Sequence, residues 1–275
     1  HMAKSCRRSI FTESILSLAL LGAFPTTMQA ATVGYWRFEN SSNLGLDSGP
    51  NGLNLTNTNS TPSVASVFSN PIPQTGATNT LAGDFELGST QSLSIGDSAA
   101  FDFDNFTIEA YVRLESIDTS STPRIIASQL NTGTGANEAW QFGVTGEDSG
   151  IGDSVAFLQL SADGTSLVNL GMTGNKLSIN KNYYLAASVN VSGSGVTAIF
   201  YLQNLTDGGS LISATRSSAS LTGGLFNSTT NFAIGSSYTS GARSRFFDGL
   251  IDEVRLSNDV LTQSELLAVP EVSSA

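Results

Sequence analysis

The sequence predicts an all-β fold, a two-sheet antiparallel β-sandwich. From residue 32 onward, short apolar or alternating runs rich in Val, Ile, Phe, Tyr and Thr are separated by Gly, Ser, Asn and Asp. This composition is typical of strands joined by turns. No stretch of ten or more residues has helical periodicity, and the one cysteine, Cys6, lies near the start of the chain. Packing, with or without a metal, must therefore stabilise the sandwich without disulfides.

The strands follow from these runs in chain order. They are expected at residues 33–38, 93–95, 106–114, 124–130, 139–144, 155–161, 183–191, 196–205, 231–236 and 249–257. Residues 54–80 have low complexity and are predicted to form a long surface excursion between early strands. In residues 261–269 a short helical turn is expected, because Thr262 precedes Glu265 by three positions, as in a capping box.

Three segments are expected along the chain. Residues 1–31 combine a two-residue cloning remnant with an early basic cluster, an apolar run over residues 15–24 and small residues after it, which is the layout of a secretory signal peptide. Residues 32–267 form one sandwich domain, and residues 268–275 form a tail. The protein is therefore expected to be exported.

Charge and histidine content exclude several classes of function. Without residues 1–30 the chain has nine basic and 22 acidic residues. Such an acidic surface argues against nucleic acids and strongly anionic polysaccharides, and it is compatible with divalent cations. His1, in the cloning remnant, is the only histidine. Histidine-based triads, histidine general bases and ordinary zinc sites are therefore excluded.

Several segments resemble one family in the right order along the chain. They are "VGYWRFEN" with "LDSGPNGLNL", then "FTIEAYVRL", "NKNYYLAASVNVSGSGVTAIFYLQN" and finally "FAIGSS" with "FFDGLIDEVRLSNDVLTQSEL". Together these segments resemble the laminin-G-like branch of the concanavalin A-like lectin/glucanase superfamily. The resemblance implies a two-sheet jelly roll with one concave face. It does not imply a particular function, because the superfamily includes lectins, glycanases, lyases and adhesive modules.

A structural calcium is implied by the last strand of this pattern. If residues 251–256 form a regular strand, Asp252 shares the buried face of Val254 and Leu256, where a lone carboxylate is costly. The resemblance implies that Asp252 helps to hold calcium with oxygens from the first strand and the following turn, for which Glu39 and Asp47 are candidates. Alternatively, Asp252 accepts backbone N–H groups or pairs with Arg37.

Ligand binding is expected in the loop "SSYTSGARSRF", where Tyr238, Arg243 and Arg245 lie between two strands. Trp140 is a further candidate for stacking on a sugar. Because Trp140 alternates with Phe142 and Val144, core packing is the alternative for it.

These observations favour an exported, lectin-like module on a bacterial surface or secreted from the cell, with a polysaccharide or cell-surface glycan as its partner and calcium as a structural cofactor. The alternatives are a polysaccharide-cleaving enzyme, either a glycanase or a tyrosine-based lyase, and a structural or adhesive surface protein. No acid-rich strand of the glycanase type was found, and no catalytic residue is assigned. The final residues, "VPEVSS", resemble the opening of the bacterial exosortase sorting signal. Membrane contact is expected only through an anchor that would follow such a signal.

Overall fold

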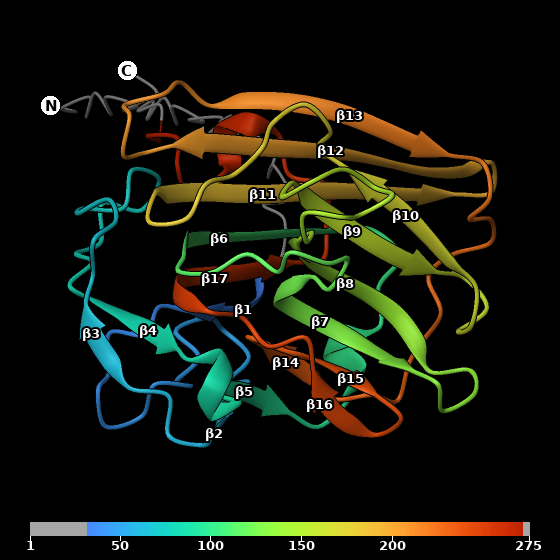
Figure 1. The fold of residues 1–275 in the computed structure, drawn as a ribbon, viewed down its shortest axis with the longest axis horizontal. Coiled ribbons are helices and arrows are strands. Elements are labelled where there is room, and N and C mark those ends of the chain that lie inside the picture. Colours follow the sequence, from blue (N-terminus) through green and yellow to red (C-terminus); the bar gives the residue numbers. More distant parts are fainter. Residues whose placement is uncertain (1–31, 272–275) are drawn as a thin grey trace, which may run out of the picture.

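The computed structural model describes residues 32–271, and these residues form a sandwich of two antiparallel sheets (Figure 1). The all-β prediction is confirmed. The helical elements among these residues are three 3₁₀ turns: η1 (Leu87–Ser89), η2 (Ala99–Phe101) and η3 (Gln263–Glu265). No helix in this part of the chain is long and apolar enough to cross a membrane. The predicted signal peptide, residues 1–31, and the last residues of the predicted tail, 272–275, lie outside the described residues.

One sheet has eight strands, with the order β13-β12-β11-β6-β17-β4-β3 and β1 paired to β17. The bounds of its strands are β1 (Thr32–Trp36), β3 (Ser63–Ala65), β4 (Leu81–Phe85), β6 (Phe106–Leu114), β11 (Asn182–Ser192), β12 (Gly195–Asn204), β13 (Ile212–Ser218) and β17 (Gly249–Ser257). The first and last strands of the domain are therefore neighbours, as the jelly-roll pattern requires.

The other sheet has nine strands, with the order β10-β9-β8-β7-β14-β5-β2 and a short β15–β16 hairpin attached. The bounds of its strands are β2 (Thr56–Thr58), β5 (Ser92–Ile95), β7 (Arg124–Thr132), β8 (Glu138–Val144), β9 (Ala156–Ser161), β10 (Leu167–Gly171), β14 (Phe232–Ile234), β15 (Ser237–Thr239) and β16 (Ala242–Ser244). All pairings are antiparallel except the short one between β15 and β7.

The main core lies between the two sheets, because one face of each strand is apolar. Its centre is aromatic: the ring of Phe232 stacks on Trp36 at 4.9 Å and on Phe101 at 5.0 Å. Trp140 packs against Phe106 at 5.0 Å between ring centroids.

A second apolar cluster covers the outer face of the eight-stranded sheet. There Tyr111 and Tyr184 of the sheet are buried beneath Leu266 and Leu267 of the C-terminal segment. The capping box predicted for this segment is confirmed, because Thr262 and Glu265 make both of its reciprocal hydrogen bonds at η3. The chain thus covers the part of this outer face around Tyr111 and Tyr184.

The regular strand predicted for residues 251–256 is wrong in one respect. The pairing of β17 with β6 shifts between Asp252 and Arg255, and Glu253 has a φ of 49°. This bulge inserts an extra residue, so Val254 shares the inter-sheet core with Ile251. Asp252 is instead opposite Tyr111 and belongs to the outer side of the sheet.

The structure also contains strands that the sequence pattern missed. Residues 54–80, predicted as an excursion, include the short strands β2 and β3. Strands β10 and β13 were not predicted because their exposed polar residues mask the alternation. Both are edge strands, where one side of the ladder has no partner strand.

Candidate functional site

A groove with a volume of about 750 Å³ lies on the outer face of the nine-stranded sheet, at its β10 edge. Its lining comes from β9, β10 and two loops, residues 121–123 and 145–151. Strand alternation decides which side chains face it. Ala156, Leu158 and Leu160 of β9 point into the inter-sheet core, which leaves Phe157 and Gln159 on the outer face.

Amide side chains form a row along this face of the sheet. The Nε2 atom of Gln159 donates to Oδ1 of Asn169 at 2.8 Å, and Nε2 of Gln141 donates to Oε1 of Gln159. The three residues lie on β8, β9 and β10, directly opposite one another in the ladder. Gln141 is fully buried, so Gln159 and Asn169 are the members of the row that present donors and acceptors at fixed positions in the groove.

Arg216 and Arg245 line the groove and come from different parts of the fold. Arg216 reaches over from β13, the edge strand of the other sheet, and its Nε donates to the Gly171 carbonyl at 2.9 Å. Its Nη2 donates to Oγ1 of Thr173 at 2.9 Å. Arg245 follows β16, with a φ of 54°, and its guanidinium makes no hydrogen bond or ion pair with any residue of the 32–271 range. Burial lowers the pKa of Arg245, whereas the charge of Glu138 opposes that shift.

Tyr238 and Arg243 lie together in a second hollow, about 470 Å³ in volume, with Asn59, Thr90 and Asn231 in its lining. The Arg243 guanidinium carbon lies 5.9 Å from the centroid of the Tyr238 ring. Its Nη2 also donates to Oγ of Ser94 at 2.6 Å. The predicted loop is therefore a tight hairpin that places Tyr238 and Arg243 in this hollow and Arg245 in the groove.

Trp140 is not available for stacking on a ligand. Its side chain is 1% exposed and lies in the core between the sheets, against Phe106 and Phe232. The core-packing alternative is correct for this residue, because Trp140 occupies the inward register of β8 with Phe142 and Val144.

Asp252 is fully buried, as expected, but on the outer side of the sheet beneath Ser66 and Asn79 rather than in the core between the sheets. It accepts hydrogen bonds from Oγ of Ser66 at 2.9 Å and from the backbone N–H of Glu253 at 2.8 Å. Burial raises the pKa of Asp252 well above its usual range, and the neighbouring Glu253 carboxylate raises it further. Arg37 pairs with Glu253 at 3.0 Å and not with Asp252.

The residues proposed to share calcium with Asp252 are occupied by other contacts. Both carboxylate oxygens of Asp47 accept backbone N–H groups, from Tyr35, Gly49 and Leu53, at 2.7–2.9 Å. Glu39 accepts the backbone N–H groups of Thr80 and Leu81. The structure therefore does not bring Glu39, Asp47 and Asp252 into one acidic group.

Asn79 lies beside Asp252 and was not foreseen as a ligand. Asn79 is 2% exposed, and its contact with the Asp252 carboxyl partly offsets the rise that burial causes in the pKa of Asp252. Its amide Oδ1 is buried without a hydrogen-bond donor among the described residues. An amide oxygen of this kind fits the oxygen-rich coordination of calcium.

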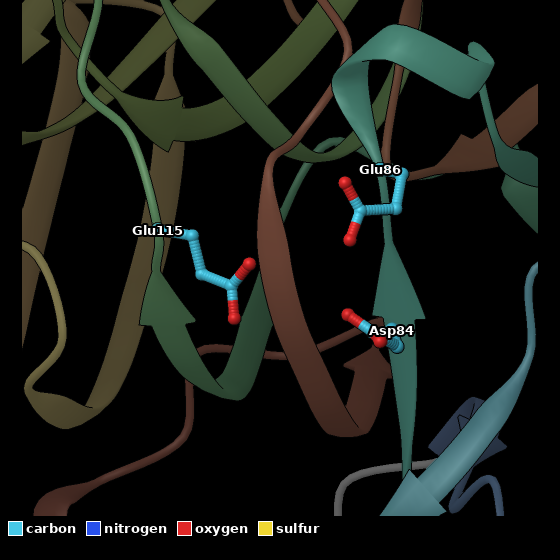
Figure 2. Close-up of side chains that lie close together, drawn as sticks. All are labelled: Asp84, Glu86 and Glu115. Carbon is cyan, nitrogen blue, oxygen red and sulfur yellow. The ribbon is translucent and has the colours of Figure 1, made fainter.

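An acidic group lies elsewhere on the sheet, formed by Asp84, Glu86 and Glu115 (Figure 2). Carboxylate oxygens of these residues lie within 4.8 Å of one another. Figure 2 shows them facing a shared space, with Asp84 and Glu86 at the end of β4 and Glu115 just after β6. Burial raises the pKa values of Asp84 and Glu115, and their mutual repulsion adds to the shift for Glu115.

This acidic group was not predicted from the sequence. Asp84 and Glu86 are two residues apart and share one face of a strand, which was a visible signal. Glu115 joins them only because β17 pairs with β4 on one side and with β6 on the other.

Comparisons with known proteins agree with the fold. A laminin-G family model, described as the concanavalin A-like lectin/glucanases superfamily, matches residues 87–267. This range is more than half of the chain, so the protein belongs to that superfamily, and the resemblance noted in the sequence is confirmed. A search of curated proteins found no match.

Solved structures similar to this chain share the fold at low sequence identity. The botulinum neurotoxin serotype D binding domain is 12% identical, with a TM-score of 0.51, over 86% of this chain and 50% of that chain. The enzymatically active domain of bacteriophage CBA120 tailspike protein 2 is 13% identical, with a TM-score of 0.51, over 78% of this chain and 30% of that chain. The chain thus spans half or less of the length of these structures, and the likeness concerns architecture.

Proposed function

We propose that the protein is a glycan-binding module and that its ligand lies in the groove on the nine-stranded sheet. The observation that carries this proposal is the hydrogen-bonded pair of Gln159 and Asn169, the two members of the amide row that line the groove. Sugar hydroxyls both donate and accept hydrogen bonds, so fixed amides of this kind match them.

The shape of the groove supports the same proposal. Its volume falls within the range of small-ligand sites, roughly 300–1,000 Å³. Phe157 is 1% exposed, so it forms the buried floor beneath the groove, and polar contacts rather than ring stacking would bind the sugar. The lining holds no Asp or Glu. The pair of carboxyl groups used by most glycosidases is thus not in this groove, which favours binding over cleavage there.

The partner is a polysaccharide or a cell-surface glycan, and the protein acts outside the cell. The predicted signal peptide and the bacterial sorting-signal resemblance support secretion or display on a bacterial surface. The botulinum neurotoxin relatives are named as binding domains, which is compatible with a binding role for this fold.

A structural calcium is part of the proposal. Asp252 and Asn79 would hold it, the first as a buried carboxylate and the second through its unpartnered Oδ1. The cation would neutralise a carboxylate that burial otherwise disfavours. Its role would be to stabilise the chain around Ser66 and Asn79 over the outer face of the eight-stranded sheet, at a distance from the groove.

A glycan array followed by titration calorimetry tests the function. The double variant Gln159→Ala/Asn169→Ala should weaken binding of any glycan found by at least about tenfold, because it removes two hydrogen-bonding amides. Arg243→Gln, in the Tyr238 hollow, should leave that affinity unchanged.

Two results would contradict this assignment. Absence of binding across a broad array would overturn the glycan-binding function. Loss of binding in Arg243→Gln, together with normal binding in the double variant, would move the ligand to the Tyr238 hollow, where the sequence analysis first predicted it.

A further inference from the structure

Some basic residues of this acidic protein form ion pairs with carboxylates and others do not. Residues 32–271 contain nine of them, and five form ion pairs with carboxylates: Arg37, Arg124, Lys176, Lys181 and Arg255. The other four, Arg113, Arg216, Arg243 and Arg245, have no carboxylate within ion-pair distance in this part of the chain. Two of these four, Arg216 and Arg245, line the same groove.

The positive charge in the groove is not cancelled by its own lining. Arg216 donates only to neutral acceptors among the described residues, namely the carbonyls of Gly171, Thr173 and Thr215 and the hydroxyl of Thr173. The guanidinium of Arg245 has no hydrogen-bond acceptor, and Glu138, whose charge acts on it, forms no ion pair with it among the described residues. A half-buried guanidinium without an acceptor is costly, and an anionic ligand group would satisfy it.

We infer that the groove selects a sugar that carries a carboxylate, either a hexuronic acid or a sialic acid. This inference rests on the proposed function and names its ligand class. The carboxylate would accept hydrogen bonds from Arg245, because guanidinium and carboxylate match in geometry. The row of Gln159 and Asn169 would bind hydroxyl groups of the same sugar or of its neighbour.

The acidic surroundings limit how much charge such a ligand can carry. The loop at the groove rim contains Glu147 and Asp148, both exposed. A heavily sulfated or continuously charged chain would run over these carboxylates and be repelled, whereas an isolated carboxylate reaches the arginines. The overall charge therefore excludes polyanions, and the groove still selects for single acidic sugars.

Matched pairs of probes test the inference by calorimetry. One arm compares galacturonic acid with its neutral methyl ester, and the other compares sialyllactose with lactose. The acidic member of at least one pair should bind at least about tenfold more tightly, and higher salt should reduce this preference. The pair that shows it identifies the source of the carboxylate.

Arg245→Gln should remove most of the preference for the acidic member while affinity for the neutral member stays the same. Arg245→Lys should retain part of the preference, which separates charge from a structural effect. Arg113→Gln removes an arginine outside the groove and should change neither affinity. The melting temperature of each variant checks that it folds.

Two outcomes distinguish a wrong carboxylate assignment from a wrong glycan-binding function. Equal binding of acidic and neutral members, unaffected by Arg245→Gln, would overturn the carboxylate assignment and leave the glycan-binding function in place. Absence of binding by every probe and by a broad glycan array would overturn the function itself.

Discussion

The guanidinium of Arg255 and the carboxylate of Glu109 form an ion pair, 2.6 Å between Nη2 and Oε1, across neighbouring strands of the eight-stranded sheet. The same carboxylate accepts the backbone N–H of Leu267 at 2.8 Å, and Arg255 donates to the carbonyl of Glu265. The hydroxyl of Tyr184 completes the set. This pair therefore connects the sheet to the segment that covers it.

Replacing Arg255 with Met should lower the free energy of unfolding by about 3–5 kcal/mol, because Glu109 would keep a buried charge without its partner. The double variant Arg255→Met/Glu109→Gln should be more stable than Arg255→Met alone, since no uncompensated charge remains. Urea unfolding of the wild type, the two single variants Arg255→Met and Glu109→Gln, and the double variant measures this coupling. Additive losses would show that the two side chains act independently.

Removal of calcium should lower the melting temperature of the wild-type protein, and Asp252→Asn should abolish that response. The physical reason is the cost of an uncompensated buried carboxylate at Asp252. Thermal unfolding with calcium and with EDTA measures the effect. Glu115→Gln is the matched control, because it removes a carboxylate from the separate acidic group.

Two results of that experiment would contradict a calcium at Asp252. A calcium response kept in Asp252→Asn and lost in Glu115→Gln would place the ion in the acidic group. A wild-type melting temperature that does not change with EDTA would contradict a stabilising calcium altogether.

Asp163 should stabilise the turn between β9 and β10 in a pH-dependent way. Its carboxylate accepts backbone N–H groups from Thr165 at 2.8 Å and Ser166 at 2.7 Å, and these bonds hold its pKa well below the usual range. Because the pKa of Asp163 is lower in the folded than in the unfolded protein, its ionised form stabilises the fold at pH values above the unfolded-state pKa, which is near 3.8. This stabilisation is lost as the pH falls from there toward the folded-state pKa.

Melting temperatures of the wild type and of Asp163→Asn, measured over a range of pH, test this direction of the pH dependence. The wild type should melt at a higher temperature at neutral pH, and the difference should shrink only below about pH 3.8. A difference that is constant over the whole range would contradict a role for the charge.

Phe232→Ala should lower the free energy of unfolding by about 3–5 kcal/mol, because it opens a cavity where the rings of Trp36 and Phe101 stack on Phe232. Glycan affinity per folded molecule should be unchanged, since Phe232 faces the core and not the groove. Denaturant unfolding and calorimetry measure the two properties separately.

Much of the fold was predictable, because long strands such as β6 and β11 carry nine or more residues of apolar or alternating sequence. The bulge in β17 was not, since it depends on the left-handed conformation of Glu253, a residue type that rarely adopts it. This single residue reversed the side of the sheet on which Asp252 was expected.

The candidate site was less predictable than the fold. The groove combines Gln159 of β9, Asn169 of an unpredicted strand, and Arg216 from the edge of the other sheet. No sequence spacing relates these residues, because the pairing of distant strands brings them together. Arg245 was predicted as a ligand-binding residue from its position in a loop. The prediction grouped it with Tyr238 and Arg243, whereas the β15–β16 hairpin places it in a different hollow from those two residues.

Thr32 and Glu271, the first and last described residues, line the same hollow beside Arg255. This hollow belongs to the eight-stranded sheet, whereas the groove opens on the other sheet. A fusion partner joined at either end would therefore leave the domain at one point and on the side away from the groove. For the same reason, a new connection between these two ends would require only a short linker, so circular permutation with new termini in an exposed turn is a feasible way to engineer the domain.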